Sequence, residues 1–103
     1  MTAKEYLQNT VSKLTAEDIA DTNTNLHFDF GGEEHYSVIV ADGVAKLENT
    51  LIGTPECVIK ASEEDFVKIA TGDMNPMMAM MMGKLKISNP AAMMKYAKML
   101  GIM

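Results

Sequence analysis

The sequence predicts an α/β (α+β) fold, with a five-stranded, mainly antiparallel sheet and helices packed on one face. Three observations support this. The first 61 residues contain four segments in which apolar and polar residues alternate, as in half-buried strands. Helix start signals dominate the rest of the chain, and its 103 residues suffice for one core. We therefore expect a single domain over residues 1–103, in which sheet and helices bury each other's apolar sides.

An amphipathic helix is predicted over residues 3–14. Thr2 and Glu5 have the spacing of a capping box, in which each side chain bonds the backbone of the other residue. Apolar residues then recur at helical spacing, at Ala3, Leu7, Val11 and Leu14. Residues 15–25 follow as a turn and a polar loop.

Four strands are expected next. Residues 26–30 and 35–41 alternate in hydrophobicity on either side of Gly31-Gly32, which indicates an antiparallel pair. Asp42-Gly43 is a two-residue hairpin signal, because both turn positions require positive φ, and residues 44–48 supply the returning strand. Residues 56–61 form the fourth strand.

Three helices and a fifth strand complete the prediction. Ser62 and Asp65 begin a helix with a buried stripe of Phe66, Ile69 and Ala70, which ends at Gly72. Asn75-Pro76 and Asn89-Pro90 each place a capping residue before a proline at the first helical position. Residues 83–88 lie between these helices and alternate as an amphipathic strand.

Charge is distributed unevenly along the chain. The net charge is -5, and the first 73 residues hold five lysines against 14 acids. The remaining residues hold no acid and four lysines, namely Lys84, Lys86, Lys95 and Lys98. The chain has no arginine, which argues against nucleic-acid binding. The four lysines either contact an anionic membrane surface or solvate an amphipathic strand and helix.

Candidate catalytic groups are few. Cys57 lies in an apolar strand, where a cysteine is typical of a core, and a thiol-dependent hydrolase using it is the weakest alternative. His27 and His35 lack the spacing of a metal site and are expected at the surface. We expect no catalytic residue, metal or cofactor. The single cysteine and the absence of an apolar leader favour a cytoplasmic protein.

Methionine is the most unusual feature of the composition, and six of the nine residues 74–82 are methionine. Such a cluster either fills a core or forms a surface that adapts to varied apolar partners. The last helix adds a broad apolar face, so we infer a Met-rich cavity between sheet and helices that binds an apolar ligand. The ligand-binding residues predicted from this cluster and this face are Met77, Met78, Met80, Met81, Met82, Met93, Met94, Ala97 and Leu100.

Motifs in the second half resemble the sterol carrier protein 2 (SCP2) family. They comprise residues 56–62, Asp65-Phe66, the Thr-Gly-Asp-Met-Asn-Pro segment 71–76 and the Gly-Lys-Leu-Lys-Ile segment 83–87. The resemblance implies a hydrophobic tunnel that holds a fatty acid, fatty acyl-CoA, sterol or phospholipid. Matched onto this sequence, it adds Phe66, Ile69, Leu85 and Ile87 to the predicted ligand-binding residues.

Two functions follow from these observations. The first is non-catalytic binding and carriage of a lipid or fatty-acyl ligand by a monomer or homodimer. The alternative is a protein-interaction or dimerisation module that uses the Met-rich surface.

Overall fold

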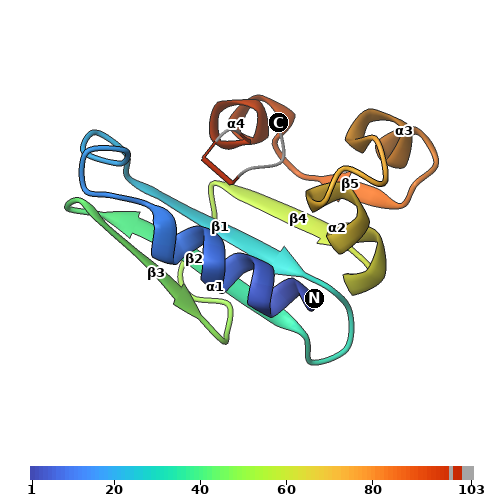
Figure 1. Ribbon diagram of the computed structural model, residues 1–103, viewed down its shortest axis with the longest axis horizontal. Helices are drawn as coiled ribbons and strands as arrows, with labels where there is room; N and C mark the ends of the chain where they lie inside the picture. Colours follow the sequence, from blue (N-terminus) through green and yellow to red (C-terminus); the bar gives the residue numbers. More distant parts are fainter. Residues whose placement is uncertain (98, 101–103) are drawn as a thin grey trace.

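The computed structural model describes residues 1–97, 99 and 100. Figure 1 shows a sheet with helices laid against it. The elements are, in chain order, α1 (Ala3–Lys13), β1 (Thr24–Asp29), β2 (His35–Ala41), β3 (Val44–Glu48), β4 (Cys57–Ala61), α2 (Glu63–Ala70), α3 (Pro76–Met81), β5 (Leu85–Ile87) and α4 (Pro90–Tyr96).

The five strands form one sheet in the order β3-β2-β1-β4-β5. Three neighbouring pairs are antiparallel, and the central pair of β1 and β4 is parallel. Leu26 of β1 lies between Val38 of β2 and Cys57 of β4, which fixes the register of the central strands. The predicted five-stranded, mainly antiparallel sheet is therefore confirmed.

One face of the sheet carries the core. Leu26, Phe28, Val38, Val40 and Ile59 alternate along β1, β2 and β4 and are almost fully buried. All the helices pack on this face, α1 toward β3 and α2, α3 and α4 toward β4 and β5 (Figure 1). Helices on a single face are what the sequence predicts.

The opposite face is polar and partly covered by the connection between β3 and β4. The Ser37 hydroxyl donates to the Thr50 carbonyl at 2.7 Å and accepts from the Ile52 backbone N–H at 3.0 Å. His27 lies on the same face, with Nε2 2.9 Å from the Ile52 carbonyl oxygen. The expectation that His27 is a surface residue is wrong, because this connection covers its ring.

Local signals place the element boundaries well. The Thr2 and Glu5 capping box forms with bonds of 3.0 and 3.1 Å. Asp42 and Gly43 have φ of 55° and 74°, as the hairpin requires. Within the described part of the chain, no helix has the length and hydropathy needed to cross a bilayer.

Candidate functional site

An apolar cavity of about 310 Å³ lies between the sheet and helices α2, α3 and α4. Among the described residues, eleven line the cavity, and all of them are apolar, with no hydrogen-bonding side chain to offer a ligand. They are Ile59, Phe66, Ile69, Pro76, Met77, Met80, Leu85, Pro90, Met93, Met94 and Ala97.

The rigid wall of the cavity comes from the sheet and α2. Phe66 packs its ring against Tyr6, Phe28 and Phe30, with centroid distances of 5.8, 5.7 and 5.0 Å. Offset and edge-on ring contacts at these distances are favourable and fix the orientation of the ring. Ile59 stands beside Phe28 in the sheet register and adds a second buried side chain to this wall.

Helix α3 forms a looser wall. The Asn75 side chain begins the helix by accepting from the backbone N–H groups of Met77 at 2.8 Å and Met78 at 3.3 Å. Gly83 ends the segment at a φ of 75°, a conformation that side chains rarely adopt, and turns the chain into β5. Ala79 is the only buried residue of this short helix, so α3 rests on β5 through one narrow face.

Helix α4 is tied to the sheet by Glu56. Its carboxylate accepts from the Thr24 hydroxyl at 2.6 Å and from the Tyr96 hydroxyl at 2.9 Å. These two hydrogen bonds lower the pKa of Glu56 below its ordinary value. The Asn89 side chain caps the helix by accepting from Ala92 N–H at 3.2 Å. Together these bonds orient α4 so that Met93 and Ala97 face the cavity.

Eight predicted ligand-binding residues line the cavity, namely Phe66, Ile69, Met77, Met80, Leu85, Met93, Met94 and Ala97. Ile59, Pro76 and Pro90 also line it but were not predicted. Ile59 could have been found, because it alternates with buried Cys57 on the core face of β4. The prolines carried only a helix-start signal, which does not reveal which way their rings face.

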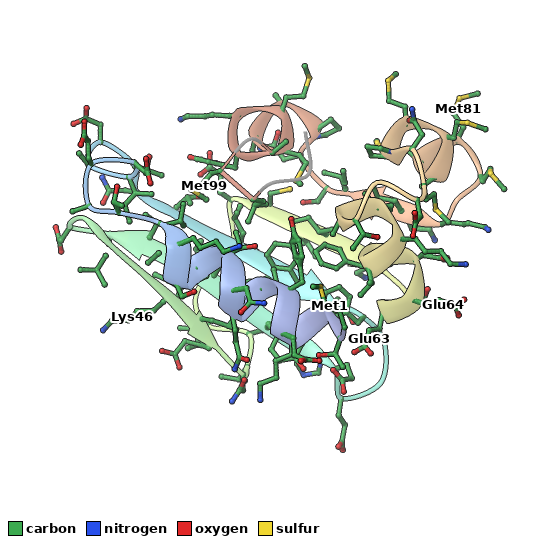
Figure 2. The ribbon with its side chains drawn as sticks, viewed as in Figure 1. Met1, Lys46, Glu63, Glu64, Met81 and Met99 are labelled. Carbon is green, nitrogen blue, oxygen red and sulfur yellow. The ribbon has the colours of Figure 1, made fainter. Side chains whose placement is uncertain are left out.

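Five other predicted residues lie outside the cavity lining. Met78, Met81 and Met82 are exposed, and Met81 projects outward from α3 with 86% of its surface exposed (Figure 2). Ile87 is partly buried against the core, and Leu100 is buried while its carbonyl accepts from the Tyr6 hydroxyl at 2.7 Å. A six-residue helix lying on a strand can turn only some of its methionines inward.

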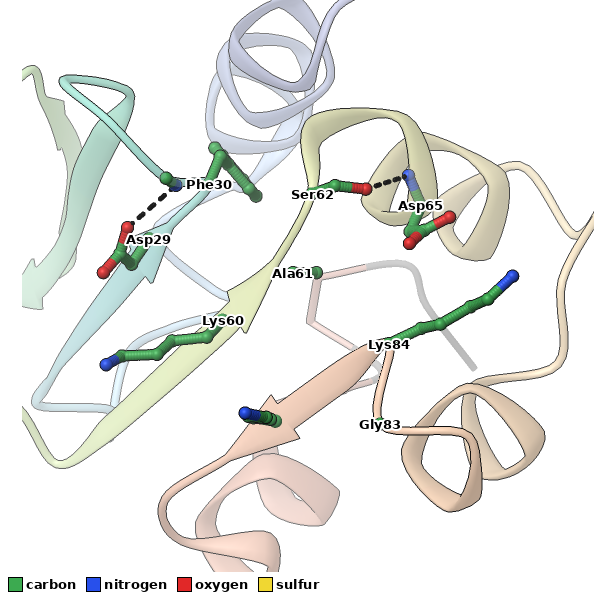
Figure 3. A pocket seen from close by; sticks show the side chains of 10 residues that line it. Asp29, Phe30, Lys60, Ala61, Ser62, Asp65, Gly83 and Lys84 are labelled. Carbon is green, nitrogen blue, oxygen red and sulfur yellow. Dashed lines mark hydrogen bonds between the residues drawn. The ribbon is translucent and has the colours of Figure 1, made fainter.

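A second, open hollow of about 510 Å³ at the end of the sheet is lined by lysines of β4 and β5, by Lys84, and by the acids Asp29 and Asp65 (Figure 3). Lys60 and Lys86 are direct partners across β4 and β5, and Asp29 is the partner of Lys60 on β1. Figure 3 shows Lys60 and Lys84 extending in different directions, so their amines do not converge on one point. Lys86 lies on the edge strand β5, where a lysine discourages pairing with another sheet.

The remaining predicted membrane-contact residues lie elsewhere. Lys95 is exposed on α4, with its amine 5.3 Å from the centre of the Tyr96 ring. The Lys98 side chain lies outside the described residues.

The candidate chemical groups are not arranged as a reactive centre. Cys57 is fully buried, and its sulfur lies 3.6 Å from the Asn89 carbonyl oxygen. This burial closes the Cys57 thiol to a substrate in the structure, as is typical of a core cysteine. Among the residues that the structure describes, no three side chains of His, Cys, Asp or Glu gather as metal ligands.

Solved structures share this fold. Sterol carrier protein 2 from Yarrowia lipolytica, in its apo form, superposes with a TM-score of 0.69 at 21% identity, covering 95% of this chain and 84% of that protein. A possible sterol carrier protein from Thermus thermophilus gives 0.61 at 18% identity, covering 99% and 83%. At these identities the likeness establishes the fold alone.

A larger enzyme contains a similar unit. The sec-alkylsulfatase from Pseudomonas sp. superposes with a TM-score of 0.78 at 14% identity over 100% of this chain. The chain spans only 16% of the length of that sulfatase. The shared fold therefore carries no information about sulfatase chemistry here.

Sequence comparison identifies the family. A search of curated proteins finds no match to this chain. A sequence model of the SCP-2 sterol transfer family, in contrast, matches residues 2–101, which is nearly the whole chain. It agrees with the motifs of residues 56–87 and with the fold of the sterol carrier structures. This chain belongs to the SCP-2 sterol transfer family.

Proposed function

We propose that this protein binds and carries an apolar lipid chain in the cavity between the sheet and helices α2, α3 and α4, without catalysing a reaction. The observation that carries the proposal is a cavity of about 310 Å³ whose described lining residues are all apolar, in a chain of the SCP-2 sterol transfer family. This volume lies at the lower end of the range usual for small-molecule sites.

The cavity favours the hydrocarbon part of a lipid over its polar part. Each buried methylene contributes about 0.8 kcal/mol, which is roughly a fourfold gain in affinity. A charged or hydroxylated group placed inside would lose its hydrogen bonds to water without replacement. We infer that the chain enters the cavity while the head group stays at the mouth, in water.

Four methionines in the lining suit a carrier of varied chains. Met77, Met80, Met93 and Met94 are unbranched and flexible, so they can repack around ligands of different length or curvature. Fatty acids, fatty acyl-CoA, sterols and phospholipids all offer suitable apolar groups. The weak attachment of α3 through Ala79 supports the same adaptability.

A displacement titration tests the binding proposal. Delipidated protein should bind a fluorescent fatty acid saturably, and unlabelled fatty acids should displace it about fourfold more strongly per added methylene until the cavity is full. Ala97→Phe should fill the cavity and weaken binding at least about tenfold, because the new ring occupies ligand space. Ala91→Phe, on the exposed side of the same helix, is the matched control.

Two outcomes of these measurements would contradict the binding proposal. A protein that takes up no probe and carries no lipid in an organic extract would overturn the carrier proposal. Equal weakening by Ala97→Phe and Ala91→Phe would show that the ligand binds elsewhere. Circular dichroism of both variants establishes that each has folded.

We also propose that the α3 side of the molecule touches anionic membranes during loading. Exposed Met78, Met81 and Met82 offer an apolar face, followed by Lys84 just before β5 and Lys86 within it. Each lysine near an anionic surface contributes about 1 kcal/mol, an attraction that salt screens. Transfer from anionic vesicles should slow as salt rises, whereas transfer insensitive to salt would overturn the docking proposal.

The same exposed methionines favour one competing function, a homodimer joined through α3. Apolar patches on a soluble surface often mark protein contacts. Concentration-dependent sedimentation that Met81→Lys abolishes, without uptake of a fatty-acid probe, would favour this alternative. We further propose a cytoplasmic location, since the only cysteine, Cys57, is buried and forms no disulfide.

A further inference from the structure

Of the four methionines in the cavity wall, Met77 and Met94 are the most exposed to solvent, whereas Met80 is 38% exposed. Met77 of α3 and Met94 of α4 line the cavity, yet 73% and 72% of their surfaces are exposed. Met93, the neighbour of Met94, lines the same cavity but is only 8% exposed. Met77 and Met94 therefore form the rim of the cavity mouth, where water and ligand both reach the thioether.

A thioether in this position is open to peroxide. Hydrogen peroxide transfers one oxygen atom to the methionine sulfur; the sulfur is oxidised by two electrons to a sulfoxide, and the peroxide is reduced to water. Exposure governs the rate, and methionine sulfoxide reductases reverse the reaction. The rim methionines should thus oxidise well before Met93.

The sulfoxide would change the chemistry of the mouth. It places a polar oxygen at the edge of a cavity whose lining is otherwise apolar. A ligand chain that covers this oxygen removes its water without supplying a hydrogen bond, which disfavours binding. Sulfoxide oxygens on Met81 or Met82 would stay in water whether or not ligand is bound, because neither residue lines the cavity.

We propose that Met77 and Met94 form a reversible peroxide-modification site whose sulfoxides weaken the binding of an apolar chain. The inference rests on the proposed lipid binding. A loss of about tenfold in fatty-acid affinity is expected when both rim residues are oxidised, the size typical of one poorly solvated polar group.

The test follows oxidation and affinity together. Protein is treated with limiting hydrogen peroxide, with and without bound fatty acid, and the sulfoxides are located by peptide mass spectrometry. A fluorescent fatty-acid titration then gives Kd before and after treatment. Met77→Leu/Met94→Leu removes the rim thioethers, and Met81→Leu/Met82→Leu is the matched control, which removes two methionines that are 86% and 62% exposed and lie outside the cavity. Because leucine changes the starting affinity, each protein is judged by its own ratio of Kd values.

The inference predicts a specific pattern. Bound fatty acid should protect the rim residues but not Met81. Peroxide should raise Kd about tenfold in the unmodified sequence and in the control variant, and by less than about twofold in the rim variant. Methionine sulfoxide reductases supplied with a dithiol, which is oxidised to a disulfide as the sulfoxide oxygen leaves as water, should restore the original Kd.

Three outcomes would overturn it. Unchanged affinity despite oxidised rim residues would remove the modification site while leaving lipid binding intact. An equal rise of Kd in the rim and control variants would show that peroxide weakens binding by oxidising residues other than Met77 and Met94. Absence of probe binding before peroxide would overturn the proposed function as well, so the two failures are distinguishable.

Discussion

Two regions of the interior are built from different side chains. The region of α1, β1, β2 and α2 contains an aromatic cluster, formed by Tyr6, Phe28, Phe30, Tyr36 and Phe66. The region of α3 and α4 contains methionines, and there the chain leaves a cavity instead of a filled core. An aromatic side chain has only two torsion angles, so packed rings favour one arrangement. The longer, flexible methionine side chain permits several packing arrangements.

The difference indicates how a small domain combines stability with adaptability. Phe66 belongs to both regions, since it packs in the aromatic cluster and lines the cavity. The aromatic cluster therefore fixes the wall that Phe66 forms, whereas the wall formed by Met77 and Met80 belongs to a helix with one buried residue, Ala79. Charge follows the same division, because every acidic residue lies in the first 73 residues.

The largest expected loss of stability comes from removing a ring from the aromatic cluster. Phe28→Ala should lower the free energy of unfolding by about 3–5 kcal/mol, because the ring is fully buried and the cavity left behind cannot collapse. Met80→Ala, in the wall of an existing cavity, should cost less than about 2 kcal/mol. Urea unfolding measures both, and equal losses would contradict the division into a rigid and an adaptable region.

A smaller loss of stability is expected when the hydrogen bond from Tyr96 to Glu56, which holds α4 against the sheet, is removed. Tyr96→Phe removes the hydroxyl that donates to Glu56 and should cost about 1 kcal/mol at neutral pH. Because the folded-state pKa of Glu56 is lowered, its stabilising contribution is present above its ordinary pKa and is lost as pH falls through the folded value. The difference between the two proteins should therefore shrink below about pH 4.5.

Binding measurements extend this prediction. Tyr96→Phe should also weaken fatty-acid binding modestly, since α4 carries Met93 and Ala97 into the cavity wall. Tyr36→Phe is the control, because its hydroxyl bonds to Glu34 two residues away, at 2.7 Å, and holds no helix against the sheet. A pH-independent difference between Tyr96→Phe and the unmodified sequence would show that the hydroxyl acts without the Glu56 carboxylate.

Local rules predicted most of the fold from the sequence. Capping residues, the two Asn-Pro pairs and Asp42-Gly43 act over a few neighbouring positions, so the sequence predicts where elements begin and turn. The parallel pairing of β1 with β4 depends on a connection that crosses the polar face, and no short-range pattern indicates it. The burial of His27 under that connection was missed for the same reason.

The cavity was predicted less completely. Composition identified the methionines, but which of them face inward depends on how α3 rests on β5. Met78, Met81 and Met82 were expected at the ligand and face solvent instead. Helical spacing from buried Ala79 could have separated them, since a six-residue helix on a strand buries only one narrow face.

The smallest expected effect on stability comes from replacing the four methionines that line the cavity. Replacing Met77, Met80, Met93 and Met94 together by leucine should change the free energy of unfolding by less than about 1.5 kcal/mol, because volume and polarity are nearly conserved. The range of ligands should narrow, since leucine has fewer ways to repack. Displacement titrations with saturated, unsaturated and branched fatty acids measure this range. Identical ligand profiles for both proteins would mean that the adaptability resides in the placement of α3, and that Ala79 and Gly83 are the residues to vary next.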